Sequence, residues 1–87
     1  MGLVAALASM LPPDAEVIGG PFCAVVLVDG SSVTVSWDDG DWLAEGWSPT
    51  GWFGGGGGDL AAALEVARDL LAYLAAVGRR RATFGSA

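Results

Sequence analysis

The chain has no lysine and no histidine, and only four arginines oppose ten acidic residues among its 87 residues. Without histidine it lacks the base of a catalytic triad, and without lysine it lacks the amine of a Schiff base. The arginines other than Arg68 lie together at residues 79–81. Up to Gly78 the charged residues are therefore all acidic except Arg68. A folded body of that sign repels phosphate, which argues against direct binding of nucleic acid.

Cysteine and long apolar runs are equally scarce. Cys23 is the single cysteine, which excludes an internal disulfide and a four-cysteine zinc site, and its apolar neighbours predict that it packs as a small hydrophobe. No segment approaches the roughly 20 apolar residues of a membrane span, and the apolar start of the chain lacks the basic residues of a signal peptide. We therefore expect a soluble, cytoplasmic protein.

The size and composition indicate one small domain. Hydrophobic residues make up 53% of the chain and charged residues 16%, a balance that supports a hydrophobic core rather than disorder. A chain of 87 residues is just long enough for one such core. The sequence predicts a single domain over residues 1–78 and a basic, flexible tail over residues 79–87.

Turn signals and apolar alternation predict an antiparallel sheet in the first half of the chain. The run 22–28 is almost entirely apolar and rich in valine, which favours a central strand covered on both faces. Asp29-Gly30 is a strong hairpin signal, and the strand after it alternates between apolar and small polar residues. Residues 38–40 predict a second turn. We expect strands over residues 22–28, 32–37 and 41–47, with a short candidate strand over 16–18.

Helical spacing of apolar residues predicts one short and one long helix. The first extends from Gly2 to Leu11, and two prolines stop it. The second begins after Asp59, a good N-cap, and ends at Gly78. Between sheet and helix, Ser48–Gly58 predicts a flexible loop because it ends in five glycines. Together these segments predict an α+β fold, in which an antiparallel meander of three or four strands packs against a C-terminal helix, with a short N-terminal helix.

Four tryptophans follow one another at intervals of five residues. That period fits neither a helix nor a strand, so they cannot all point into one core. Trp37 shares the apolar side of its strand and is expected inside. Trp42 and Trp47 fall on opposite faces, so one of them should be exposed, and Trp52 is expected at a loop tip beside Phe53. Exposed indoles among acids suit a binding hot spot, although they could equally fold back as a lid over the sheet.

The acids and glycines do not form a catalytic or metal-binding motif. Asp38, Asp39, Asp41 and Glu45 lack the alternating spacing of a calcium loop and indicate a polar turn. The glycine run before the last helix has only the outline of a phosphate cradle, since no lysine follows it and Asp59 opposes phosphate. We expect no catalytic residue, no cofactor and no metal site, and therefore a protein that is not an enzyme.

Two segments carry a resemblance to a known class of proteins. They are the acidic meander Asp-Gly-Ser-Ser-Val-Thr-Val-Ser-Trp-Asp-Asp-Gly-Asp-Trp at residues 29–42 and the helix over residues 59–77. In these the chain resembles the small acidic inhibitors carried by phages, including anti-CRISPR proteins. The resemblance implies a short, non-catalytic protein that blocks a nucleic-acid-handling complex by covering or mimicking a binding surface. It assigns no role to any single residue.

The leading functional prediction is a non-enzymatic inhibitor or adaptor that docks on a basic protein surface, such as that of a nucleic-acid-binding complex. Acids would steer the encounter, and exposed tryptophans would anchor it. One alternative is a small structural homodimer, and another is a module that binds a sugar or other small ligand through its tryptophans. The predicted partner-binding residues are Asp38, Asp39, Asp41, Trp42, Glu45, Trp47 and Trp52.

Overall fold

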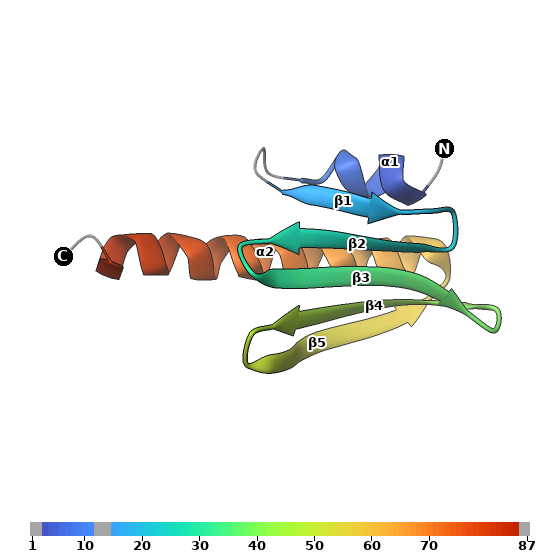
Figure 1. Cartoon of the computed structure of the whole chain (residues 1–87). Coiled ribbons are helices and arrows are strands. Elements are labelled where there is room, and N and C mark those ends of the chain that lie inside the picture. The colour runs from blue at the N-terminus through green and yellow to red at the C-terminus, as the bar shows by residue number, and fades with distance from the viewer. Residues whose placement is uncertain (1–2, 12–14, 86–87) are drawn as a thin grey trace.

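A computed structural model describes residues 3–11 and 15–85 of the chain, with side chains described as far as Val77. Within that part the chain forms five strands between two helices (Figure 1). The elements are α1 (Leu3–Ala8), β1 (Glu16–Gly19), β2 (Cys23–Val28), β3 (Ser31–Asp38), β4 (Asp41–Ser48), β5 (Gly51–Gly58) and α2 (Leu60–Gly85).

The strands form one antiparallel meander in the order β1-β2-β3-β4-β5. α2 packs against β3, β4 and β5, while α1 packs against β1 and β2. Both helices contribute to the same core, so they lie on one face of the sheet and leave the other without a helix (Figure 1). The predicted α+β class is therefore confirmed, with a five-stranded sheet in place of the expected three or four strands.

The core lies between the helices and one face of the sheet. On the sheet side, small and β-branched residues alternate inward along β2, β3 and β4. On α2, Ala63 and Ala67 are fully buried, which lets the helix axis approach the strands closely. The buried residues are Leu3, Leu7, Ala24, Val26, Val33, Val35, Ala44, Ala63, Ala67, Leu70, Leu71 and Leu74.

The two Asp-Gly pairs form the expected hairpin turns. Asp29 and Gly30 have φ angles of 48° and 82°, and Asp39 and Gly40 have φ angles of 50° and 94°. Positive φ at both central residues is the geometry that matches the right-handed twist of a two-residue hairpin. The turn over residues 29–30 is confirmed, and the turn predicted over residues 38–40 is present at 39–40, since Asp38 is the last residue of β3; the two turns fix the register of β2, β3 and β4.

The polyglycine segment is a strand and not the flexible loop that its composition predicts. Gly54–Gly58 pairs in regular register with β4, and at two of its positions the backbone of β4 leaves no room for a side chain. A Cβ on Gly55 would lie 2.8 Å from the carbonyl oxygen of Ala44. A Cβ on Gly57 would overlap the carbonyl oxygen of Trp42. The prediction of a linker over Ser48–Gly58 is wrong because packing on both sides compensates the entropy that ordered glycines lose.

α2 begins as the sequence predicts but ends later. The amide of Ala62 donates a hydrogen bond of 2.8 Å to Oδ1 of Asp59, which confirms the N-cap. The helix backbone continues through Gly78 to Gly85, so the predicted end at Gly78 is wrong. A glycine inside a helix costs about 1 kcal/mol relative to alanine, and the arginines that follow it are good helix formers. The division into a body over residues 1–78 and a tail over residues 79–87 stays a prediction.

The N-terminal helix is shorter than expected. α1 ends at Ala8, three residues before the predicted end at Leu11. Two buried leucines, Leu3 and Leu7, dock it on the core. The prolines expected to stop it, at residues 12 and 13, lie outside the described residues. No helix in the described part of the chain is both long enough and apolar enough to cross a membrane.

We predict that Gly57→Ala destabilises the fold by about 1–3 kcal/mol, because the new methyl group meets backbone that cannot rotate away. Gly20→Ala is the matched control, since a Cβ there has no neighbour within 4 Å. The control should leave the free energy of unfolding unchanged or raise it by up to about 1 kcal/mol. Urea denaturation of the two variants measures the difference. Equal stability of both would contradict the strand assignment.

Candidate protein-binding surface

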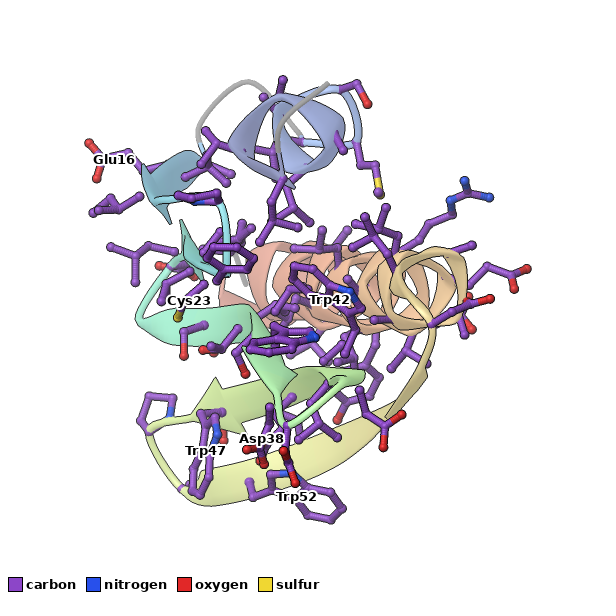
Figure 2. All side chains as sticks on the ribbon, turned by 90° about the vertical axis from the view of Figure 1, so that its right-hand side faces the viewer. Glu16, Cys23, Asp38, Trp42, Trp47 and Trp52 are labelled. Carbon is purple, nitrogen blue, oxygen red and sulfur yellow. The ribbon has the colours of Figure 1, made fainter. Side chains whose placement is uncertain are left out.

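The sheet has a second face, which neither helix covers in the described part of the chain. We call it the open face (Figure 2, in which it faces left). Strand register places alternate residues of β1 to β5 on it, and neighbouring strands align them in rows. One complete row consists of Glu16, Leu27, Ser32, Trp47 and Trp52.

Large apolar side chains on the open face are exposed to solvent. Trp47 and Trp52 are 47% and 57% exposed, and Ile18 and Leu27 are also among the exposed large hydrophobic residues. Trp47 and Trp52 are cross-strand partners next to the turn that joins β4 to β5. Scattered apolar residues are normal on any surface, but two neighbouring exposed tryptophans, with Leu27 two strands further along the same row, are a concentration of apolar area that suits an interaction site.

The apolar run that forms β2 was expected to be covered on both faces, and this is wrong. Only the side that carries Ala24 and Val26 is buried by the helices. Cys23 and Leu27 lie on the other side and are exposed, so Cys23 is not packed as a small core hydrophobe. β2 thus has apolar residues on both faces, but in the described part of the chain helices cover only one of them.

The tryptophans divide between the two faces and the end of the sheet. Trp42 packs against the core between the sheet and α2, while Trp47 points away from the helices, which confirms that one of the pair is exposed (Figure 2). Trp37 was expected in the core, yet it is 48% exposed. It does share the helix-facing side of β3, but it lies at the strand end, where it pairs with the exposed Phe22 at a ring-centroid distance of 5.8 Å.

Trp52 is exposed as expected, but the loop tip assigned to it is a strand. A register shift between Gly46 and Trp47 places Phe53 on the helix side, next to the exposed Trp52. A Cβ on Gly46 would lie 2.5 Å from Cζ of Phe53, so this glycine provides the space for that ring. Phe53 then stacks on Tyr73 of α2 with ring centroids 5.2 Å apart. The lid interpretation therefore holds for Phe53 and Trp42, and not for Trp47 or Trp52.

The structure separates the predicted partner-binding residues into three places. Asp38 and Asp41 are cross-strand partners beside the turn residue Asp39, at the far end of β4 from Trp47. Trp47 is six residue steps along β4 from Asp41, a distance of about 20 Å. Trp42 lies inside. Glu45, Trp47 and Trp52 lie together on the open face, whereas Asp38 and Asp41 fall on the same side by register but at the other end of the strands.

Charge on the open face is negative only. Strand register places the carboxylates of Glu16, Asp38, Asp41 and Glu45 on this side, and the five strands contain no lysine, arginine or histidine. Arg68, the one basic residue whose side chain is described, is exposed on α2. Among the described residues, no group of three or more acids and cysteines is placed to hold a metal ion. The face therefore offers apolar contact and negative potential.

Sequence reasoning missed Ile18, Leu27 and Phe22 as surface residues. The signal was present for Leu27, because a period of two along β2 places it with Cys23 on the side opposite Ala24. It was overlooked because the continuous apolar run suggested cover on both sides. Comparisons with protein families, with curated proteins and with solved structures found no significant match to this chain.

We predict that Cys23 reacts with a water-soluble disulfide reagent in the native protein, without denaturant, because its side chain is exposed. The release of the coloured thiolate measures the rate, and the urea-unfolded chain gives the reference. The chain has one cysteine, so the signal needs no assignment. Labelling that begins only when the protein unfolds would show that the open face is covered.

Proposed function

We propose that the protein is a non-enzymatic binding module, whose open face docks on a basic surface of another protein. The observation that carries the proposal is the cross-strand row in which exposed Leu27, Trp47 and Trp52 lie beside carboxylates and no base. Tryptophans are enriched among the residues that dominate protein interfaces, because they bury a large area with few rotatable bonds.

The sign of the charge favours a basic partner. Two copies of the chain placed face to face would bring Glu16 and Glu45 of each copy into one acidic interface, and like charges at close range cost binding free energy. The hairpin acids Asp38, Asp39 and Asp41 extend the negative potential beyond the contact area and steer a basic partner toward the protein. Nucleic acid, which is itself negative, is repelled.

Basic surfaces on proteins commonly serve to bind nucleic acid. The proposal therefore extends to an inhibitor or adaptor that occupies such a surface and competes with nucleic acid for it. The apolar row would provide the affinity, and the acids would provide the association rate and the choice of partner. Binding of this kind weakens as the salt concentration rises.

We predict that Trp47→Ala weakens partner binding by about 2 kcal/mol, or roughly thirtyfold, mainly through faster dissociation. Tyr73→Ala is the matched control, because Tyr73 is a half-exposed aromatic residue on α2, away from the open face. Affinity capture from an extract of the native cells, quantified by mass spectrometry, supplies the partner. Its dissociation rate is then measured with both variants.

The proposal requires that the partner lost with Trp47→Ala is retained with Tyr73→Ala, and that added nucleic acid displaces it. Equal loss with both variants would overturn the open-face assignment. Direct binding of single-stranded DNA by the isolated protein would overturn the charge argument.

A further inference from the structure

β5 forms one edge of the sheet, and its outer side is unprotected. In the described part of the chain β5 is hydrogen-bonded only to β4 (Figure 1). Edge strands usually carry a proline or a charged residue, most often lysine, which prevents further pairing. Gly51–Gly58 contains none of these, and its register shift lies near its start, which leaves Gly54–Gly58 regular. A row of unpaired backbone groups is thus open to an added strand.

On the open face, side chains of β4 lie over the glycines and approach this edge. A Cβ on Gly55 would lie 3.4 Å from Cγ of Glu45, and a Cβ on Gly57 would lie 3.1 Å from Cδ2 of Leu43. Both side chains therefore lean across β5. A residue added beyond Gly55 would meet the stem and carboxylate of Glu45, because no β5 side chain stands between them.

On the helix face, α2 provides an apolar contact at the same edge. A Cβ on Gly54 would lie 3.0 Å from Cδ2 of Leu70, and a Cβ on Gly56 would lie 3.4 Å from Cγ2 of Val66. Val66 is only half-buried, so part of its side chain remains available to a neighbour of β5. The two faces of an added strand would thus meet different surroundings: the carboxylate of Glu45 beside Leu43 on the open face, and apolar side chains of α2 beneath.

We propose that Gly54–Gly58 binds an extended segment of a partner protein as a sixth strand, in which basic and apolar residues alternate. Its backbone pairs with the free edge of β5, its basic side chains reach Glu45, and its apolar side chains contact Val66. This is recognition by strand addition, in which backbone hydrogen bonds supply affinity and alternate side chains supply specificity.

A second copy of the chain is a poor occupant of this edge. Its own β5 has no basic residue to reach Glu45, and six of its eight residues are glycines. The proposal goes beyond docking on the open face, because it concerns backbone pairing at the edge of the sheet. Trp47 is on β4 and does not border Gly54–Gly58, so the two proposals can fail separately.

The test uses a short capped peptide that alternates lysine and valine, titrated into the isotope-labelled protein. Peptide binding should shift the amide resonances of Gly54–Gly58 and slow their exchange with solvent. A peptide with glutamate in place of lysine should not bind. Two further peptides are N-methylated at alternate residues, one at the odd and one at the even positions, so that each lacks the backbone N–H donors along one of its edges. At least one of them must fail to bind, because strand addition uses the donors of one edge.

Glu45→Lys should weaken binding of the lysine–valine peptide on the order of tenfold, and Glu45→Gln should weaken it less. Glu16→Lys is the matched control, because it makes the same charge change on the open face at the opposite edge of the sheet. Trp47→Ala should leave this binding unchanged.

Three results would overturn strand addition: equal binding of the glutamate peptide, binding of both N-methylated peptides like the parent, or equal loss with Glu16→Lys and Glu45→Lys. Shifts confined to residues outside Gly54–Gly58 would overturn it as well. Loss of peptide binding with Trp47→Ala would place the peptide on the open face instead of the edge.

Discussion

The close fit of the all-glycine segment Gly54–Gly58 of β5 against β4 and α2 is the constraint on which the rest of this structure depends. Gly55 and Gly57 lie against the backbone of β4, and Gly54 lies against Leu70 of α2. Glycine is the only residue that fits these contacts without a shift of backbone or core. Because α2 follows β5 directly, the same fit fixes where the helix begins and which face of the sheet it covers.

A consequence of this arrangement is a sheet that is covered on one side only. α1 and α2 share one face, and the apolar residues of the other face remain exposed in the described part of the chain. A small domain cannot bury all its apolar surface, but here exposed Leu27, Trp47 and Trp52 lie in one cross-strand row, interrupted only by Ser32. The proposed docking of a basic partner gives that row, and the carboxylates beside it, a common purpose.

Local signals predicted much of the fold correctly. Asp29-Gly30 and Asp39-Gly40 determine their turns because few residue pairs adopt positive φ at two successive positions. Asp59 marked the start of α2 because its side chain satisfies a free amide of the first turn. These features depend on a few consecutive residues, so the sequence alone is sufficient to predict them.

Features that depend on distant contacts were predicted less well. The polyglycine strand is ordered by the backbone of β4 and by α2, and glycine has no intrinsic preference that would reveal this. Trp37 has the periodicity of a core residue, but it lies beyond the cover that the helices provide. For Cys23, an apolar run could not show whether one face or two were covered. The candidate site was predicted in part for the same reason, since register separated the hairpin acids from Trp47 and Trp52.

Native-state hydrogen exchange at Gly54–Gly58 tests the account most directly. If this segment is an edge strand, protection should alternate along it, with slow exchange at amides that face β4 and fast exchange at those on the free edge. Uniform exchange of all five amides at the rate of an unstructured chain would show that the segment is a linker. In that case the fit between β4 and α2, and the proposed strand addition, would both be wrong.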